Sequence, residues 1–296
     1  MRIRESDDRD AEAIAQLLLA ADDTRVISAE GVRHRRRTQP ERARVVELVV
    51  EADVVVATGM AGLDTWTTTE GVGWAFLTVD ASYQRQGLGD ELGRRLLDHL
   101  RGVGATSVTS FFRRTDEGER WVTARGWSLL SHGPLIAVDP RSVQEVSIPA
   151  GYRTMPMTEV AAEAVYEAVK ETVLDEPGPT RHDDVRLDEF LREWEEPDTD
   201  LESSTAILDS SGNVVAFTFL NVAGERAQHG FTGTRREHRG RGLATAAKQR
   251  ALRTAAASGV TRVTTSNAEE NAAMRAINRN LGFEPIGEHV IFGRDL

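Results

Sequence analysis

The 296-residue sequence contains no cysteine, which excludes disulfides, cysteine-ligated zinc, thiol catalysis and iron–sulfur clusters. No apolar run approaches the roughly 18 residues that a membrane-spanning helix requires, and the first residues lack the apolar stretch of a signal peptide. Basic residues are outnumbered by acidic ones, 36 against 47, and the formal charge of −11 disfavours general nucleic-acid binding, which depends on neutralising phosphates. These absences predict a cytoplasmic protein that binds neither membranes nor nucleic acids.

A weak internal repeat divides the chain. Three landmarks align between the halves: Val79–Gly89 with Thr234–Ala244 at an offset of 155 residues, Gly126-Trp127 with Gly282-Phe283 at 156, and Ile3-Arg4 with Tyr152-Arg153 at 149. Offsets this similar indicate duplication of one domain-sized module rather than a solenoid. We predict an N-terminal domain of residues 1–145 and a C-terminal domain of residues 146–296, joined within the Pro- and Gly-containing segment 139–151.

Both halves show the same order of predicted elements. An amphipathic helix (11–20 or 159–173) and a polar segment precede three strand-like runs. These runs are 44–50, 54–58 and 73–79 in the first half and 204–208, 214–222 and 230–234 in the second. A Gly-rich turn then opens a long helix, followed by a strand, a helix ending in Gly-aromatic, and a closing strand pair. The order ααβββαβαβ predicts an α/β fold in which each domain is a mixed, mostly antiparallel sheet flanked by helices.

Two Gly-rich turns, residues 84–89 and 239–244, lie between a predicted strand and a predicted helix. The first amides of a helix have no intrahelical partners, and with the positive end of the helix dipole they attract anions. Glycine also lets the backbone approach a diphosphate closely. Taken alone, each copy has an ordinary strand-to-helix turn as its alternative. Neither fits the dinucleotide fingerprint, whose third glycine position holds Leu92 or Thr245, and the Walker Gly-Lys-Ser/Thr is missing.

Both turns fit the pattern [Gln/Arg]-x-x-Gly-x-[Gly/Ala]. With the element order and Leu281-Gly282-Phe283, the chain resembles the GNAT superfamily of N-acetyltransferases over nearly its whole length, most strongly in the second half. The resemblance implies a tandem GNAT protein that uses acetyl-CoA and holds its pyrophosphate through backbone amides of the turn. It also implies direct attack of an amine on the thioester in a ternary complex, with a base or relay water taking the amine proton.

The resemblance assigns cosubstrate-binding residues in both halves. In the second half they are Thr232, Gly233, Thr234, Arg239, Gly240, Arg241, Gly242, Leu243, Ala244, Thr245, Asn267 and Asn271, and in the first half they are Val79, Gln84, Arg85, Gln86, Gly87, Leu88 and Gly89. Asn267 and Asn271 would line the pantetheine channel. Asparagine also caps helices well, so both have a structural alternative, and the two roles can coexist.

The usual catalytic acid of the family is absent. Many GNAT members place a Tyr four residues before Gly-Phe as donor to the departing sulfur, where this chain has Val122 in the first half and Asn278 in the second. Val122 has no group to donate. We expect the amide of Asn278 to hydrogen-bond the sulfur.

The usual base is absent as well. Histone acetyltransferases of the family carry a Glu six residues before a landmark valine, where this chain has Gly73 and Gln228. By its chemistry His229 is the candidate replacement, with Glu288 and His289 on the closing strands as others. A structural or exposed histidine is the alternative for His229.

Three features favour the C-terminal half as the acetyltransferase and a partly degenerate N-terminal half. The strand before the first turn has no polar side chain at alternate positions, and Val122 replaces the acid. In addition, Asp90 and Glu91 follow the first turn, where the second half has Thr245 and Ala246. Acidic residues there suit the helix dipole but repel a pyrophosphate.

The negative charge is concentrated in one segment. Residues 171–202 contain thirteen acids and three arginines, a net charge of −10 that leaves −1 for the other 264 residues. In the family this region walls the acceptor site, so an acidic wall edged by Phe190 and Trp194 would attract a small cationic amine. The alternative is a solvated amphipathic helix. The opposite charge run, Arg33–Arg37, is either a solvated face or a contact for a phosphate or acidic partner.

Other functions stay open. A non-catalytic CoA-binding or scaffold protein is the main alternative, because neither half shows the usual base or acid. A nucleotide-binding oxidoreductase is disfavoured by the failed fingerprint. No metal is expected, since His182 with Asp183-Asp184 lies in a polar loop. Tandem GNAT proteins are often monomers whose halves pack as a homodimer would, and the resemblance implies the same here.

Overall fold

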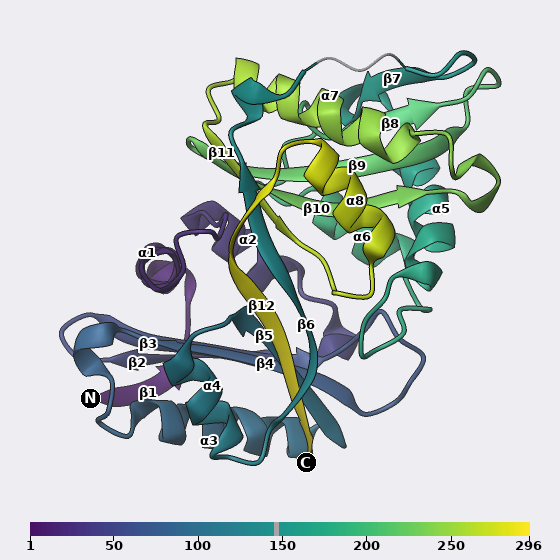
Figure 1. The fold of residues 1–296 in the computed structure, drawn as a ribbon. Helices are drawn as coiled ribbons and strands as arrows, with labels where there is room; N and C mark the ends of the chain where they lie inside the picture. The colour runs from purple at the N-terminus through teal and green to yellow at the C-terminus, as the bar shows by residue number, and fades with distance from the viewer. Residues whose placement is uncertain (145–147) are drawn as a thin grey trace. The chain divides into compact units, whose positions relative to one another are not determined.

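The computed structural model describes residues 1–144 and 148–296 (Figure 1). The chain forms two compact units, Met1–His132 together with His289–Leu296, and Gly133–Glu288. Each unit therefore includes a segment from beyond the predicted domain division: the C-terminal residues complete the first unit, and residues 133–144 belong to the second. The predicted boundary between residues 145 and 146 lies outside the described residues.

The first unit is a six-stranded sheet with helices. Its elements are β1 (Arg2–Glu5), α1 (Ala11–Ala21), α2 (Ala29–Thr38), β2 (Val46–Glu51), β3 (Val55–Leu63), β4 (Val72–Val79), α3 (Leu88–Gly102), β5 (Ser107–Arg113), α4 (Asp116–Thr123) and the first residues of β6 (Ser128–Val138). The strand order is β1-β2-β3-β4-β5-β12, and only β4 and β5 run parallel within this described set. The sixth strand is His289–Asp295, which pairs antiparallel with Ser107–Arg113.

The second unit repeats this plan. It contains the end of β6, then β7 (Arg153–Pro156), α5 (Ala162–Thr172), α6 (Leu187–Trp194), β8 (Thr205–Leu208), β9 (Val214–Ala223), β10 (Arg226–Thr234), α7 (Leu243–Ala257), β11 (Arg262–Ser266), α8 (Ala272–Asn280) and the start of β12 (Glu284–Asp295). The strand order is β6-β11-β10-β9-β8-β7. Strands β10 and β11 are the parallel pair of its described residues, and Leu135–Val138 of β6 pairs antiparallel with β11.

The predicted mixed, mostly antiparallel α/β architecture is confirmed, with two differences in the strands. The four-residue edge strands β1 and β7, which precede the first helix of each half, were not expected. Instead of a closing strand pair, each half ends in one long strand, β6 or β12. These long strands contribute to the two units in different parts, which no local pattern in the sequence indicates.

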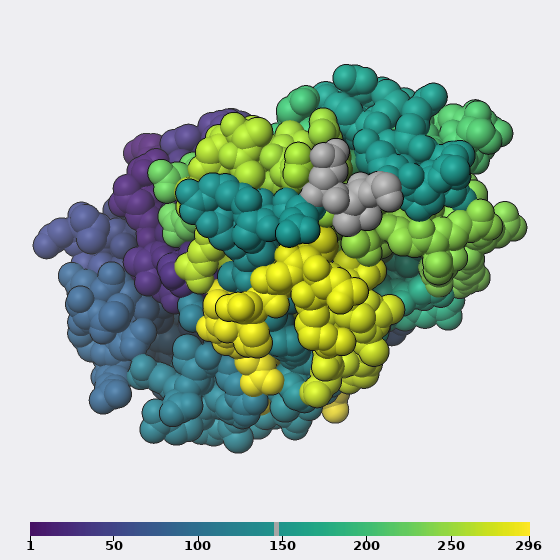
Figure 2. All heavy atoms as spheres, turned by 45° about the horizontal axis from the view of Figure 1, so that its top comes forward, coloured from purple at the N-terminus to yellow at the C-terminus, as the bar shows by residue number. Residues whose placement is uncertain are grey.

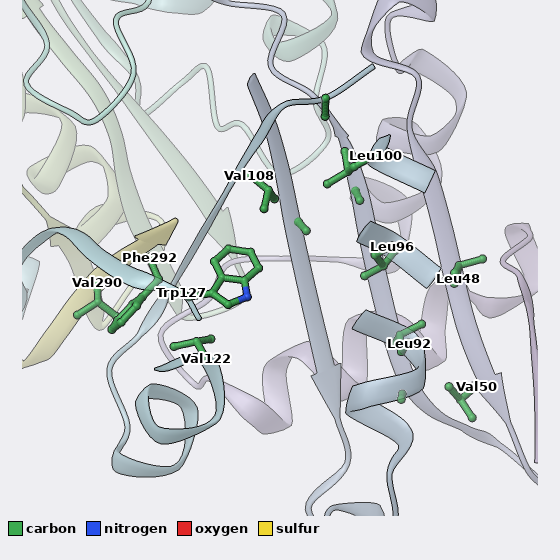
Figure 3. Packing of buried hydrophobic residues seen from close by; sticks show 14 of the residues in the cluster. Leu48, Val50, Leu92, Leu96, Leu100, Val108, Val122, Trp127, Val290 and Phe292 are labelled. Carbon is green, nitrogen blue, oxygen red and sulfur yellow. The ribbon is translucent and has the colours of Figure 1, made fainter. Parts of the chain in front are cut away.

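The core of the first unit forms around α3 (Figure 3). Leu92, Leu96 and Leu100 are at most 1% exposed, as their spacing of four residues along one helix face predicts. Figure 3 shows them beside Leu48 and Val50 of β2. Burying each of these large side chains contributes about 1.5–3 kcal/mol relative to exposure. The packing fixes α3, and with it the Gly-rich turn that begins the helix.

The second unit packs α7 closely against its sheet. The buried face of α7 is rich in alanine, and Ala246 and Ala247 join Leu243, Ile207 and Val215 in one core cluster. Small side chains let the helix lie near the strands. A second cluster around Leu252, Phe283 and Val263 fixes the other end of α7 and the end of α8. The start of α7 is therefore packed against β8 and β9, the latter being the neighbour of β10 in the sheet.

Candidate active site

Strand β10 is irregular at its centre. Its pairing with β9 shifts by one residue between His229 and Thr232, so that Gly230 and Phe231 together oppose the single residue Phe219. Two residues against one is a β-bulge, which bends the strand and interrupts its ladder of hydrogen bonds. Bulges of this kind re-aim backbone groups, and they are frequent next to active sites.

The bulge lies where β10 leaves its parallel neighbour. The pairing of β10 with β11 is limited to Arg226–Gln228 against Arg262–Thr264. From His229 to Thr234, the edge of β10 toward β11 has no strand partner among the described residues. Backbone amides and carbonyls on that edge are available to a ligand that can bind like a strand.

The Gly-rich turn follows β10 after one short 3-10 helix, Arg236–His238. Gly240 has φ +74° and Gly242, the N-cap of α7, has φ +77°, a conformation that favours glycine. A Cβ built at either glycine would meet nothing within 4 Å, so both face open space. The amides of Leu243, Ala244 and Thr245 occupy the first helical turn, where no intrahelical acceptor exists. This arrangement is the predicted anion site.

The side chain at the first position of the motif braces the turn. The Arg239 Nε donates to the Thr234 carbonyl at 2.9 Å, and in the first unit the Gln84 Nε2 donates to the Val79 carbonyl at 3.2 Å. Both side chains therefore close the loop back onto the end of the preceding strand. This explains why the motif accepts either Gln or Arg, since each can supply an N–H donor.

In the second unit, Asp175 reinforces this brace. Its carboxylate accepts from Arg239 at 2.7 Å and from Arg236 at 2.7 and 3.0 Å, and these bonds hold the pKa of Asp175 well below its usual range. The Glu171 carboxylate accepts from the Arg236 amide at 3.0 Å. The remaining arginine of the turn, Arg241, donates to the Tyr152 hydroxyl at 2.8 Å. Two of the acids counted in segment 171–202 thus serve the turn.

The first unit has the same turn in its backbone. Arg85 (φ +59°) and Gly87 (φ +79°) take the left-handed conformations of Gly240 and Gly242, and Gly87 is likewise the N-cap of its helix, α3. Leu88 begins α3 and Gln86 donates to the Ser82 carbonyl at 3.4 Å. The predicted equivalence of the two turns therefore extends to their dihedral angles.

The surroundings of the first turn differ. A Cβ built at Gly89 would lie 3.6 Å from the Trp121 side chain, whose ring packs over the start of α3. The Arg125 guanidinium stacks on this ring at 4.2 Å and pairs with Asp90. Hydrogen bonds from arginines of α3 lower the pKa of Glu91 to about 2, so an ionised carboxylate stands in the first helical turn. Acids thus stand in the first turn of α3, each paired with an arginine, where the second unit has Thr245 and Ala246.

The strand before the first turn also differs. Strand β4 pairs with β3 in one unbroken register from Gly73–Leu63 to Val79–Ala57, without a bulge. Its parallel pairing with β5 ends after Trp74, as in the second unit. The two units therefore share the open edge and the turn, but only the second has the bulge.

His229, the expected base, is buried rather than open to an acceptor. It is 4% exposed, and its imidazole lies on the side of the sheet that faces α7. Burial, and then the charge of Lys248, lowers the pKa of His229 well below its usual range. Its Nδ1 lies 3.3 Å from Thr218 Oγ1, while Nε2 has no hydrogen-bond partner within the described chain. The burial does not fit direct removal of a proton from a substrate.

Asn278, the expected sulfur donor, is also buried, with 0% exposure. Its Nδ2 donates to Asn267 Oδ1 at 2.6 Å, which ties α8 to the end of β11, and its second N–H remains for another acceptor. Asn271 is the N-cap of α8 and accepts from the Met274 amide at 3.2 Å, so its capping role is confirmed. Figure 2 shows residues beyond 270, in yellow, at the molecular surface.

Gly233 marks close packing. A Cβ at this position would lie 2.5 Å from Thr172 Oγ1 of α5 and 2.7 Å from the Phe217 ring, so a larger residue would push α5 away. The neighbouring Thr232 does not point into open space, because its hydroxyl lies 2.7 Å from Thr218 Oγ1. Gly233 and Thr232, both predicted to bind the cosubstrate, therefore also hold β10 in place within the second unit.

The acidic helix α6 lies next to the bulge. The rings of Phe190 and Trp194 lie 6.2 and 6.1 Å from Phe219, the residue opposite the bulge. The helix is therefore amphipathic, as the alternative interpretation of this segment expected, and its apolar face is packed, with Phe190 3% exposed. Glu193, the acid of α6 that follows Phe190, is thereby held near the bulge of the same unit, with Glu195 and Glu196 directly after the helix.

Carboxylates crowd at the end of α6. Desolvation, and then the charges of Glu196 and Glu189, raises the pKa of Glu193 to about 7, although its side chain keeps an exposed face. The charge of His182 acts weakly in the opposite direction. The crowded acids favour a cationic ligand, whose charge would lower this pKa.

Other expectations are resolved by local pairing. His289 belongs to the first unit, where burial lowers its pKa to about 4, so it is no candidate base for the second unit. His182 Nδ1 lies 3.4 Å from Glu176, and no group of three or more His, Asp or Glu among the described residues is placed to hold a metal. In the run 33–37, Arg36 pairs with Glu47 and Asp8.

Three residues of this site were not predicted: Thr218, Lys248 and Asp175. Thr218 is a polar residue at the centre of the apolar strand β9, and a polar residue in such a place could have indicated a functional or structural role. Lys248 is 1% exposed on α7, and burial lowers its pKa to about 7. Two features of the sequence could have pointed to Lys248. It lies among alanines of a predicted helix, and it is one of only two lysines in the chain.

Comparison with known families settles the class of protein. The model of the acetyltransferase (GNAT) family matches the chain twice, at residues 12–119 and 165–283, which together exceed half its length. The chain belongs to the GNAT family. It is a tandem acyltransferase with two GNAT modules, as its repeat predicted. Enzymes of this family use acyl-CoA for acetyl transfer.

Solved structures share this fold. A tandem GNAT protein from the clavulanic acid biosynthesis pathway is 20% identical over 99% of this chain and 98% of its own, with a TM-score of 0.75. A GCN5-related N-acetyltransferase from Sphaerobacter thermophilus is 20% identical over 99% and 95% of the two chains, with a TM-score of 0.72. A putative acetyltransferase from Pyrococcus horikoshii is 14% identical over 100% and 89%, with a TM-score of 0.64. No curated protein matched the sequence.

The described helices also bear on membrane insertion. Within residues 1–144 and 148–296, no helix combines the length and the apolar character that crossing a membrane demands.

Proposed function

We propose that the second unit of this GNAT protein transfers an acetyl group from acetyl-CoA to the amine of a small cationic acceptor, by direct attack in a ternary complex. The first unit is partly degenerate and does not catalyse the transfer. The observation that supports this most is the bulge in β10, which lies between an open strand edge and a Gly-rich turn. Strand β4 of the first unit has no such bulge.

The residues around the second turn fit acetyl-CoA. The open space at Gly240 and Gly242 leaves room for a diphosphate, and the amides of residues 243–245 supply donors. Arginines 236, 239 and 241 add positive charge nearby. The edge of β10 from the bulge to Thr234 would receive the pantetheine arm through backbone hydrogen bonds. When bound, acetyl-CoA supplies the activated acyl group, and the protein's own groups orient it.

His229 and Asn278 are both buried, and they are distinguished by protonation: burial lowers the pKa of His229 well below its usual range, whereas a hydrogen bond from Asn278 needs no change of charge. Asn278 keeps one N–H for the departing sulfur, and a thiol with a pKa of about 8.5 leaves without a strong acid. The buried His229 instead positions β10, so that the amine proton passes to water. Placement of the reactants would then supply most of the rate enhancement, as effective molarities in oriented reactions allow.

The acceptor class follows from α6. Its end holds several acids beside an aromatic cluster of Phe190, Trp194 and Phe219, at the residue opposite the bulge. An ammonium group is attracted by carboxylates and by aromatic faces alike. The acids would also concentrate cationic amines near the thioester.

A panel of amines tests this function. Thiol release from acetyl-CoA is followed with a disulfide reagent, which has no protein background because the chain lacks cysteine. We expect release above background with polyamines, aminoglycosides or amino sugars, and lower kcat/KM with neutral nucleophiles of similar size. Equal rates for neutral and cationic nucleophiles would contradict the proposed acceptor class.

Glu193 gives this proposal a pH dependence. Its raised pKa keeps the carboxyl protonated below about pH 7, so the negative charge that attracts the acceptor develops as pH rises through 7. We expect Glu193→Gln to raise the acceptor KM by about 5- to 10-fold at pH 8, corresponding to about 1 kcal/mol, and to change it little at pH 6. Glu195→Gln, on the same turn, is the matched control. An equal effect of Glu193→Gln at both pH values would show that titration of Glu193 near pH 7 does not control acceptor binding.

The burial of His229 supports an alternative function, in which the protein binds CoA but does not catalyse transfer. A protein without an accessible base side chain is compatible with a CoA-binding scaffold that does not catalyse transfer. The same panel separates the two, because a scaffold would bind acetyl-CoA in calorimetry and release no thiol with any amine.

A further inference from the structure

The bulge of β10 is fastened at both ends to one residue of β9. Thr218 Oγ1 lies 3.3 Å from His229 Nδ1, at the start of the bulge, and 2.7 Å from Thr232 Oγ1, at its end. Thr218 is 0% exposed and His229 is 4% exposed. Hydrogen bonds in such a buried place are protected from competition by water.

The chemistry of these groups allows a continuous chain. A neutral imidazole has one N–H, and the low pKa of His229 keeps it neutral. With Nδ1 as donor, its N–H is shared between the Thr218 hydroxyl and the Phe219 backbone, and the Thr218 hydroxyl in turn donates to Thr232. A valine at position 218 would have nearly the same shape and neither capacity.

The register of the bulge explains why it needs a tie. Gly230, within the bulge, is exposed, and a Cβ there would make only ordinary van der Waals contact with Phe219, so the local packing does not lock the register. A flexible, partly exposed dipeptide opposite a single residue can slip by one position, which would turn every following side chain of β10 to the other face. A tie across the bulge prevents this slip.

We propose that Thr218, His229 and Thr232 form a clip that fixes the β10 bulge and so positions its backbone for the acyl group, with Thr218 as the positioning residue at its centre. This rests on the proposed function of the second unit. The first unit supports the assignment, because β4 has no bulge and the corresponding strand β3 makes no such tie in the described residues. Its buried Thr58 instead contacts the Leu48 carbonyl at 3.3 Å.

Kinetics of full-length variants test the clip. Thr218→Val removes both contacts, and we expect kcat to fall about 10- to 100-fold, the scale expected when a reactant is misplaced by about 1 Å. The dissociation constant of acetyl-CoA, measured by calorimetry, should change less than about 3-fold, because the turn stays intact. Thr218→Ser keeps the hydroxyl and should restore kcat to within about 3-fold of the original.

Thr58→Val is the matched control, since it removes one hydrogen bond of a buried threonine in the first unit. It should lower stability without changing kcat. An unchanged kcat in Thr218→Val, or an equal loss in Thr58→Val, would overturn the proposal. If Thr218→Val does not fold, Thr232→Val removes one of the two contacts and is judged by the same criteria.

A second readout does not depend on turnover. Hydrogen exchange of the peptide covering residues 226–234 should become at least about 10-fold faster in Thr218→Val than in the original protein or in Thr218→Ser. Unchanged exchange would overturn the clip even if the protein is active. If the original protein acetylates no amine, the proposed function fails, and the exchange result alone decides whether the clip exists.

Discussion

At the scale of single residues, the buried Lys248 is the most unusual group of the second unit. Its ammonium lies 5.6 Å from the centroid of the Phe283 ring, and His229 lies on the same ring at 6.1 Å between centroids. Both groups are nearly inaccessible and both have lowered pKa values, chiefly through burial. Holding two basic groups in this core reduces stability, since neither can be charged there at low cost.

Lys248→Met should therefore stabilise the protein. The folded pKa is about 7, whereas the unfolded chain keeps about 10.4, so the destabilisation by Lys248 is complete below pH 7 and is lost as pH rises toward 10. We expect the free energy of unfolding to increase by about 2 kcal/mol at pH 6.5, with the gain shrinking toward zero by pH 10. Urea denaturation at several pH values measures this. Lys170→Met, at the exposed second lysine, is the control, and an equal, pH-independent gain in both variants would refute the explanation.

At the scale of elements, the two Gly-rich turns show how one backbone shape is kept by different residues. The first left-handed position is Arg85 in one unit and Gly240 in the other, while the second is glycine in both. An L residue there costs about 1 kcal/mol. In the first turn Arg85 adopts this strained conformation. Its side chain is exposed and forms a weak ion pair with Glu117 at 3.6 Å.

Gly240→Ala measures the strain directly. Because a Cβ at Gly240 would meet nothing within 4 Å, the whole effect should come from the backbone, and we expect a loss of about 1 kcal/mol in the free energy of unfolding. Gly102→Ala, in α3 and equally free of contacts, should instead stabilise by about 0.5 kcal/mol. Chemical denaturation of both variants provides the comparison. A Gly240→Ala variant as stable as the original would show that the turn relaxes out of the left-handed conformation.

Patterns of neighbouring residues in the sequence predicted the helices and turns that such short-range patterns are sufficient to specify. The stripe Leu92, Leu96, Leu97 and Leu100 predicted α3, although Leu97 is half-buried, and the repeated motif predicted both turns. The bulge was beyond reach, because it depends on the register of β10 against β9 and on no residue type in β10 alone. A structural role for His229 was one of two open interpretations, and the sequence could not decide between them because its neighbour Lys248 lies 19 residues away, on another element. Side-chain chemistry suggested a base where tertiary packing has made a core residue.

At the scale of the whole molecule, the duplicated modules differ in the parts to which the proposed function assigns acetyl transfer. They share a sheet plan, an open strand edge and a braced turn. They differ in the bulge, in the acids of the first helical turn and in the position of Val122 or Asn278. The net charge of −11 is likewise divided unequally, since residues 171–202 of the second unit account for −10. Duplication followed by such divergence predicts that one unit binds the cosubstrate productively.

Matched substitutions in the two turns test this division. Glutamate at Gly242 places a negative charge where the pyrophosphate would lie, and we expect Gly242→Glu to weaken acetyl-CoA binding at least about 50-fold, or about 2.3 kcal/mol, in calorimetry. Gly87→Glu should leave the affinity within about 2-fold and the transfer rate unchanged. Gly242→Ala imposes the same backbone strain without charge, so it should weaken binding far less than Gly242→Glu. Loss of binding in Gly87→Glu with retention in Gly242→Glu would assign the cosubstrate site to the first unit, and loss in both would mean that the two turns depend on each other.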